Sequence, residues 1–247
     1  MKTVESRDGT EIAYDVAGSG PSLVLVGGAF NTRMSPARLI PYLTEQFEVY
    51  SYDRRGRGDS GTGQNSPEHE LDDLEAVIYA AGGSAHVFGH SSGAILALEA
   101  AARDGSGIAK LAVYEPPFTP DDDPALVPDI EAALAAGDRA AAAERFLAST
   151  GAPVHWMKTQ PWWGGMVAVA HTLPNEFALA AADVPVARYA RIGIPTLVMN
   201  GGASPAWAAA ATAAIAGAIA GSRTRVLAEQ DHNPADELLA AALAEFF

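Results

Sequence analysis

The most informative part of the sequence is residues 85–93, which read AHVFGHSSG. The residues Ala85–Phe88 predict a buried strand, and the residues that follow have the composition of a helix. Between them lies a Gly-x-Ser-x-Gly pattern, Gly89–Gly93, at a strand-to-helix turn. So tight a turn leaves no room for a side chain two residues before or after the serine, so glycine is needed at both places. The pattern predicts that Ser91 is exposed at the end of the strand as a nucleophile.

Outward from this turn, short β-branched runs alternate with helical segments. The predicted strands are Val4–Ser6, Ile12–Val16, Leu23–Val26, Glu48–Tyr52, Ala85–Phe88, Ala109–Tyr114, Thr196–Met199 and Thr224–Leu227. The predicted helices are Ser35–Gln46, Glu68–Ala81, Ser92–Arg103, Pro205–Ala220 and Pro234–Phe246. This alternation predicts an α/β fold, a mostly parallel eight-stranded sheet with helices on both faces. The first two strands are expected to form a hairpin.

The alternation breaks once, between Pro116 and Ile194, in a stretch that contains three of the four tryptophans. We expect residues 116–194 to form a small helical cap inserted between two strands of the sheet. Residues 1–115 and 195–247 then form the core domain.

The composition excludes several classes of function. With 16 basic and 30 acidic side chains, the 247-residue chain has a net charge of -14, which argues against nucleic acid or an anionic membrane as partner. It has no cysteine, so thiolate nucleophiles and cysteine-based metal sites are absent. The histidines lack the spacing of a metal site, and we expect neither metal nor cofactor. Charged residues interrupt the N-terminus, where a secretory signal would be apolar, and we expect a soluble, cytoplasmic protein.

A serine hydroxyl is a weak nucleophile and needs a general base. Among the six histidines, His232 lies in the loop 229–234, between the last strand and the last helix. From there a side chain can reach back over the strand ends. The other five fall in the nucleophile strand, its turn, a surface helix or the cap. The sequence therefore predicts His232 as the base.

These pieces together resemble the α/β-hydrolase superfamily. The resemblance rests on Leu23–Phe30, Tyr52–Ser60 (YDRRGRGDS), Gly89–Gly93 and the loop that contains His232, and it covers nearly the whole chain. It implies the α/β-hydrolase fold and the chain order nucleophile, acid, histidine. It does not identify the substrate. In this superfamily the segment Asp53–Ser60 is usually a structural loop.

The acid departs from the usual pattern of this superfamily. Most relatives have an aspartate after the strand Thr196–Met199, where this chain has Ser204. Because a serine cannot supply the negative charge that stabilises an imidazolium, either there is no acid or it comes from another strand end. Glu115, at the tip of the neighbouring strand, is our candidate, since the chain resembles zearalenone-type lactonases, which have a glutamate there. Asp53 and Asp231 are weaker alternatives.

Acyl transfer also needs donors for the oxyanion. The N–H of Ser92 heads the helix after the nucleophile, and the N–H of Ala29, or else of Phe30, follows the glycine pair after the strand Leu23–Val26. Apolar side chains suited to a substrate pocket are Phe30, Trp156, Trp162, Trp163 and Met166. The alternative is that the cap residues among them pack the cap onto the core.

We therefore expect a serine hydrolase that needs no cofactor and cleaves a small-molecule carboxylic ester or lactone through an acyl-enzyme. One alternative is a cofactor-free perhydrolase or haloperoxidase, because Tyr52–Gly56 resembles a sequence found in several of them. Another is a weakly active, ligand-binding member of the fold, suggested by Ser204 in place of the acid. The oligomeric state stays open.

Overall fold

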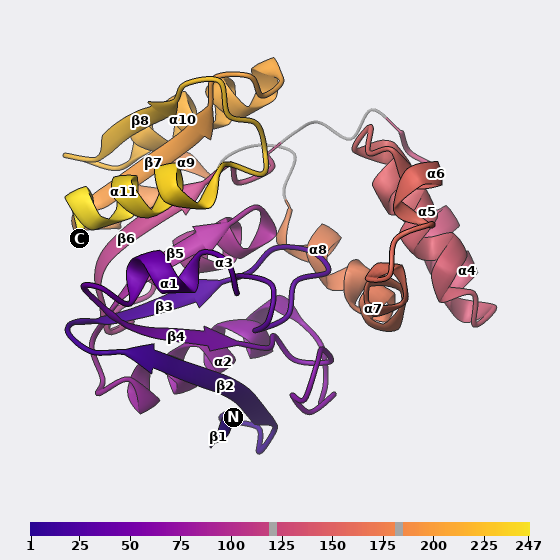
Figure 1. The fold of residues 1–247 in the computed structure, drawn as a ribbon, viewed down its shortest axis with the longest axis horizontal. Coiled ribbons are helices and arrows are strands. Elements are labelled where there is room, and N and C mark those ends of the chain that lie inside the picture. The colour runs from indigo at the N-terminus through magenta and orange to yellow at the C-terminus, as the bar shows by residue number, and fades with distance from the viewer. Residues whose placement is uncertain (119–122, 181–184) are drawn as a thin grey trace.

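The computed structural model describes residues 1–118, 123–180 and 185–247. Within these residues an eight-stranded sheet runs through the molecule in the order β1-β2-β4-β3-β5-β6-β7-β8 (Figure 1). The strands are β1 (Lys2–Glu5), β2 (Glu11–Gly18), β3 (Ser22–Val26), β4 (Glu48–Tyr52), β5 (Ala85–His90), β6 (Ile108–Tyr114), β7 (Thr196–Gly201) and β8 (Arg223–Leu227). The pairings of β2 with β1 and with β4 are antiparallel, and the others are parallel. The prediction of a mostly parallel eight-stranded sheet is confirmed.

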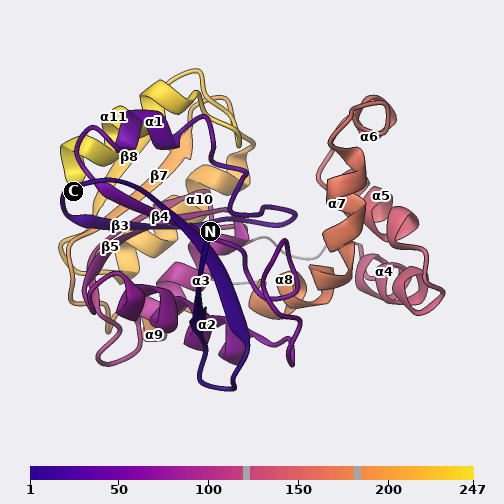
Figure 2. The same ribbon diagram turned by 60° about the horizontal axis from the view of Figure 1, so that its bottom comes forward.

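Helices cover both faces of the sheet, as predicted. One face packs against α2 (Pro67–Ala80), α3 (Ser92–Ala101) and α10 (Ala206–Ala218), and the other against α1 (Ile40–Leu43) and α11 (Asp236–Phe246). Figure 2 shows α1 and α11 on one side of the strands, with α2 and α3 on the other. No helix in the described part of the chain is both long enough and apolar enough to cross a bilayer.

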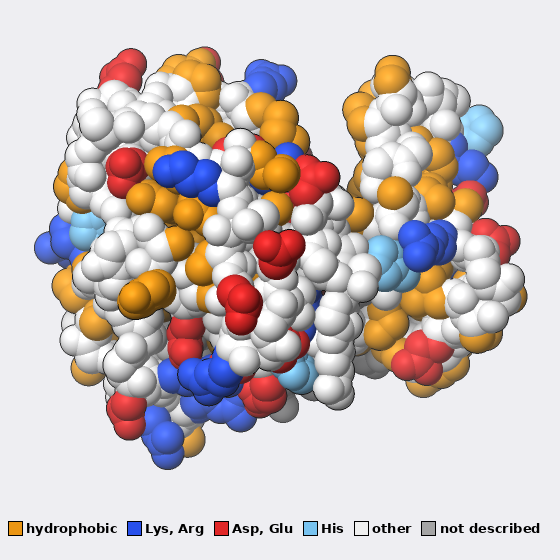
Figure 3. Space-filling model, turned by 90° about the horizontal axis from the view of Figure 1, so that it is seen from below, with side chains coloured by type: hydrophobic (Ala, Val, Ile, Leu, Met, Phe, Trp, Pro, Cys, Tyr) orange, Lys and Arg blue, Asp and Glu red, His pale blue; other side chains and the backbone are white. Residues whose placement is uncertain are grey.

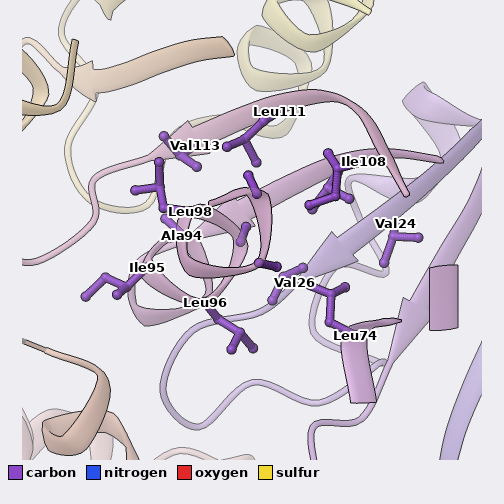
Figure 4. Close-up of a cluster of buried hydrophobic side chains, with 14 of the residues drawn as sticks. Val24, Val26, Leu74, Ala94, Ile95, Leu96, Leu98, Ile108, Leu111 and Val113 are labelled. Carbon is purple, nitrogen blue, oxygen red and sulfur yellow. The ribbon is translucent and has the colours of Figure 1, made fainter. Parts of the chain in front are cut away.

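The core is centred on α3, the helix that follows the Ser91 turn. Every residue of α3 except Glu99 is buried. Figure 4 shows its side chains, Leu98 among them, clustered with Val26 of β3 and Val113 of β6. A helix that is apolar on all sides is stable only inside a core. The nucleophile candidate therefore stands on a rigid support.

Helices between β6 and β7 form a smaller lobe beside the core (Figure 1). They are α4 (Leu126–Ala135), α5 (Arg139–Ser149), α6 (Val154–Met157), α7 (Trp163–Val169), η1 (Ala170–Thr172) and α8 (Leu173–Leu179). The lobe has its own small apolar cluster, and Figure 3 shows a notch between it and the core. Of these helices, α8 contacts α2 and α3. The short α9 (Val186–Tyr189) packs on α10, and the cap limits 116–194 stay a prediction.

One predicted helix is much shorter than expected. The sequence predicts a helix over Ser35–Gln46, but only Ile40–Leu43 is helical, with turns on either side. The reason is Pro41, which has no N–H to donate to a preceding carbonyl and is tolerated only in the first turn. The segment therefore covers the sheet with a single helical turn.

The turn that carries Ser91 is packed against backbone on several sides. A Cβ on Gly93 would lie 2.3 Å from the carbonyl oxygen of Val26 and 2.6 Å from that of Gly27, and a Cβ on Gly89 would lie 2.5 Å from the Gly93 carbonyl oxygen. Backbone atoms inside a sheet cannot move aside for a methyl group. Both glycines are therefore required for α3 to begin directly at the end of β5.

Replacing Gly93 with alanine should destabilise the protein by about 1–3 kcal/mol, because the new methyl overpacks the contact with β3. The matched control is Gly217→Ala in α10, where an added Cβ meets no atom within 4 Å. That change should stabilise the protein by about 0.5–1 kcal/mol, because alanine favours a helix over glycine. Urea unfolding of both variants measures the two effects, and a Gly93→Ala protein as stable as the wild type would contradict the packing described here.

Candidate active site

Ser91 lies at the carboxyl end of β5, in a strained backbone conformation. Its φ is 57° and its ψ is -128°, which non-glycine residues rarely adopt. Its N–H donates to the carbonyl of Tyr114 at 3.0 Å, which ties the turn to β6. On the other side, a Cβ added to Gly28 would lie 2.8 Å from Ser91 Cβ and 3.3 Å from Ser91 Oγ. The loop after β3 therefore passes directly over the serine.

Glu115 and His232, 117 residues apart in the chain, meet beside this turn. Glu115 follows the last residue of β6, is fully buried and has a φ of 47°. Its Oε2 lies 2.7 Å from Nδ1 of His232. Its Oε1 accepts a hydrogen bond from the N–H of Gly201 at 2.7 Å and another from the hydroxyl of Ser204 at 2.5 Å. The carboxylate is therefore held on both oxygens, with one aimed at the imidazole.

The surroundings of Glu115 favour its charged form. Burial alone raises the pKa of this carboxyl, but the hydrogen bonds from His232, Ser204 and Gly201 outweigh burial and bring the pKa below its ordinary value of 4.5. Glu115 is therefore ionised at neutral pH. Its stabilising contribution is present above that ordinary value and is lost as the pH falls through the lowered pKa.

Ser204 occupies the position where an aspartate was expected, and it has a defined partner. It serves the Glu115 carboxylate as a hydrogen-bond donor. The two alternative acids are engaged elsewhere. Asp53 is ion-paired with Arg33, and Asp231 Oδ1 accepts from the N–H of Asn233 at 2.8 Å. Of the three acids considered from the sequence, Glu115 is the one that the structure places on His232.

Two aromatic side chains from outside the loop that carries His232 hydrogen-bond to its backbone carbonyls. The hydroxyl of Tyr114 donates to the carbonyl of Asp231 at 2.5 Å, and Nε2 of His90 lies 2.8 Å from the carbonyl oxygen of His232. Desolvation and the nearby His232 lower the pKa of His90 to about 4. His90 is therefore neutral at pH 7 and donates its Nε2 proton to that carbonyl. The ring of Trp207 lies edge-on to the His232 ring, with 6.1 Å between centroids.

Sequence reasoning did not find these supporting roles. His90 is adjacent to the nucleophile, and Tyr114 precedes Glu115, so both stand next to residues that were singled out. Trp207 follows the Ser204 loop, and its role depends on how α10 packs. Adjacency to a predicted site residue is the signal that could have identified His90 and Tyr114.

The predicted oxyanion residues lie on either side of Ser91. Ser92 is the first residue of α3 and is buried. Ala29 and Phe30 belong to the loop that approaches Ser91 through Gly28, and Phe30 has a positive φ of 62°. The structure thus brings both candidate donor segments close to the nucleophile, while their role as oxyanion donors stays a prediction.

The aromatic residues predicted to bind substrate lie in different surroundings. Trp156 and Trp162 are 56% and 44% exposed and contact each other edge-on, with 6.0 Å between ring centroids. Trp163 packs against the apolar cluster of the cap. Phe30 reaches from the loop over Ser91 to Phe146 of α5, at 5.5 Å between centroids.

Phe30 is therefore the candidate that joins the site to the cap. The substrate role of Phe30, the tryptophans and Met166 stays a prediction. Phe146, which the sequence reasoning did not single out, lies on the same side of the site. Among the described residues, no group of three or more histidines and acids is arranged to hold a metal ion.

The chain resembles known proteins in sequence and in fold. The model of a family described as "Alpha/beta hydrolase family" matches residues 18–246. The chain belongs to the α/β-hydrolase family. This hydrolase is 48% identical to an alpha/beta hydrolase from Sphaerobacter thermophilus DSM 20745, with a TM-score of 0.93 over the whole of both chains. It shares its fold with the enol-lactonase from Burkholderia xenovorans LB400, at 22% identity and a TM-score of 0.79 over 99% of each chain.

Curated relatives match over a smaller part of the hydrolase. It is 34% identical to the N-formylmaleamate deformylase of Pseudomonas putida over 107 residues, which are 41% of this chain and 40% of the relative. A probable oxidoreductase, EphD, from Mycobacterium tuberculosis is matched over 19% of its own length. The match therefore spans less than half of these relatives, and it supports the family more than any one activity.

Replacing Ser204 with alanine should destabilise this hydrolase at pH 7 by about 1–3 kcal/mol, because the buried charge of Glu115 loses a donor. The deficit should shrink as the pH falls below about 4.5 and then through the lowered pKa of Glu115, because the carboxyl is protonated in both proteins once the pH is below that pKa. Urea unfolding between pH 7 and pH 3 measures both effects.

The matched control is Ser222→Ala, since that hydroxyl donates only to the carbonyl of Ala216 near the surface. A Ser204→Ala deficit that is the same at every pH would contradict the ionised state assigned to Glu115.

Proposed function

We propose that this hydrolase cleaves a carboxylic ester or lactone through an acyl-enzyme, with Ser91 as nucleophile, His232 as general base and Glu115 as the acid. The observation that carries the proposal is the 2.7 Å contact between the buried Glu115 carboxylate and Nδ1 of His232, beside a strained serine. Proteins of similar structure include the enol-lactonase and an esterase from Rhodococcus sp. ECU1013, and they support the same reaction class.

The Glu115 contact determines which ring nitrogen of His232 acts as the base. An ionised carboxylate accepts a hydrogen bond from the N–H at Nδ1, so the lone pair of the neutral ring is on Nε2. That nitrogen takes the proton of the Ser91 hydroxyl as Oγ attacks the substrate carbonyl carbon. The charge that develops on the imidazole is stabilised by Glu115, which stays ionised throughout.

The tetrahedral intermediate then collapses. His232 gives its proton to the leaving oxygen, the bond between that oxygen and the acyl carbon breaks, and the acyl group remains on Ser91. A water molecule attacks the acyl carbon while His232 takes its proton. The second collapse releases the carboxylic acid and returns the proton to Ser91.

Negative charge on the substrate oxygen builds up in both steps. The N–H groups of Ala29 and Ser92 would donate hydrogen bonds to this oxygen, and the N-terminus of α3 adds its partial positive charge. Both donors belong to backbone, so they are set by the positions of the loop after β3 and of α3 rather than by side-chain identity.

The perhydrolase alternative gains no support from the packing of its motif. Arg54 and Arg55 of the segment Tyr52–Gly56 are buried in ion pairs with Glu70 and Asp73. They hold this segment against α2 and do not distinguish water from peroxide as the acyl acceptor.

In an assay with p-nitrophenyl esters from acetate to octanoate, we expect wild-type turnover that Ser91→Ala abolishes. Glu115→Gln should lower kcat by about 10³- to 10⁴-fold, because the neutral amide no longer stabilises the imidazolium. The matched control is Asp231→Asn, which removes an acid next to His232 that faces its own loop, and its kcat should stay within about threefold of the wild type.

Turnover by Ser91→Ala would show that Ser91 is not the nucleophile. If Asp231→Asn lost more activity than Glu115→Gln, the acid would be Asp231. A wild-type protein that neither turns over the esters nor reacts at Ser91 with a fluorophosphonate would instead support the ligand-binding alternative.

A further inference from the structure

Four charged side chains lie buried together beneath the loop over Ser91. They are Arg54 and Arg57 from the segment after β4, Glu70 from α2 and Glu176 from α8 of the cap, each at most 4% exposed. Two positive and two negative charges balance. Burying charges is nevertheless costly even when they are paired, and apolar residues of similar size often stabilise a fold as well or better.

Arg57 connects the cap to the loop over the nucleophile. Its Nη1 donates to the carbonyl of Gly28 at 2.7 Å and to that of Asn31 at 3.2 Å. Its Nη2 is ion-paired with Glu176. Burial raises the pKa of Glu176, but Arg54 and Arg57 outweigh this effect and bring that pKa below its ordinary value, so Glu176 is ionised at neutral pH.

The contact with Gly28 has a geometric consequence for Ala29. The carbonyl of Gly28 and the N–H of Ala29 belong to one planar, trans peptide, and they point in opposite directions. A guanidinium that holds this carbonyl therefore also sets the direction of the Ala29 N–H. The N–H of Asn31 donates to the same carbonyl at 3.2 Å, so the peptide is held from two sides.

Arg54 contacts both segments that flank Ser91. Its Nη1 lies 3.2 Å from the hydroxyl of Ser92, 3.3 Å from the carbonyl of Gly27 and 3.2 Å from the Glu176 carboxylate. One cap carboxylate thus connects, through two arginines, to both segments that hold the expected oxyanion donors.

We propose that Arg57, held by Glu176 of the cap, is a positioning residue that orients the Ala29 N–H toward the oxyanion. The inference rests on the proposed ester or lactone hydrolysis. It makes the seating of α8 on the core a condition for a complete oxyanion hole, so the cap acts on the rate of the chemical step and not only on substrate binding.

A neighbouring arginine separates this role from simple stabilisation. Arg55 lies in the same segment and is as deeply buried, and it pairs with Asp73 and Asp8. Its remaining hydrogen bonds go to the carbonyls of Gln64 and His69, away from the loop over Ser91. A purely structural role would make Arg55 and Arg57 equivalent, whereas positioning requires only Arg57.

The effect should appear in kcat. Oxyanion charge exists in the transition state and not in the bound substrate, so a misdirected donor slows the reaction and leaves KM almost unchanged. Complete loss of one donor costs about 10²- to 10³-fold in kcat. A donor that is present but misdirected should cost less, about 10- to 100-fold.

The test uses the double variant R57M/E176M, which removes one charge of each sign and leaves the Arg54–Glu70 pair in place. We expect kcat for p-nitrophenyl acetate to fall about 10- to 100-fold, with KM within about threefold of the wild type. Affinity for an aryl trifluoromethyl ketone, which forms a tetrahedral oxyanion on the serine, should fall in parallel with kcat. Circular dichroism checks that each variant is folded.

Two single variants complete the experiment. R57K keeps the charge but cannot hold two carbonyls and a carboxylate with one planar fork, and its kcat should lie between those of the wild type and the double variant. The matched control R55K should lower the urea midpoint while kcat stays within about threefold.

Three results would overturn the inference: a folded R57M/E176M with wild-type kcat, a rise in KM at constant kcat, or an equal loss of kcat in R55K. If the double variant does not fold, R57K with wild-type kcat and ketone affinity overturns it as well. These results differ from a failure of the proposed function, in which the wild type itself would lack ester turnover and the inference would fall with it.

Discussion

A carboxylate that is sealed from water must find its hydrogen bonds inside the protein, and Glu115 obtains three of them from two other strand ends. The N–H of Gly201 ends β7, Ser204 follows it, and His232 comes from the loop after β8. One buried charge therefore joins the carboxyl ends of β6, β7 and β8. The position of the histidine depends on this junction, since Tyr114, the residue before Glu115, also holds the backbone of the same loop.

The opposite side of Ser91 is organised by buried ion pairs. Arg57 and Arg54 hold carbonyls of the loop after β3, and Glu176 brings the cap to the same point. The serine between these two groups has a strained backbone that α3 and β6 maintain. Preorganised groups of this kind cost nothing in reorganisation when charge develops, which is the main source of catalysis in acyl transfer.

The sequence predicts those features that depend on local pattern or on strand order. The eight-stranded sheet and the glycine-bounded turn at Ser91 follow from periodicity and local motif. The contact of Glu115 with His232 follows from the resemblance to hydrolases that have a glutamate at this strand end. The donor role of Ser204 was not predicted, because the residue was compared only with a missing acid. The pairing of Arg57 with Glu176 spans 119 residues and depends on how α8 seats on the core, which no local pattern encodes. Helix α1 is shorter than the sequence predicts because Pro41 lacks an N–H and fits only the first turn of a helix.

The catalytic arrangement depends on the hydrogen bond that Glu115 accepts from Nδ1 of His232. This hydrogen bond can be observed in the downfield region of the proton NMR spectrum. The spectrum is recorded for the wild type and for Glu115→Gln, each labelled with ¹⁵N in its histidines. The proton on Nδ1 of His232, hydrogen-bonded to a buried carboxylate, should give a strongly deshielded resonance. This resonance should move upfield or vanish in the variant. A resonance that is the same in both proteins would contradict the account, because His232 would then have another partner.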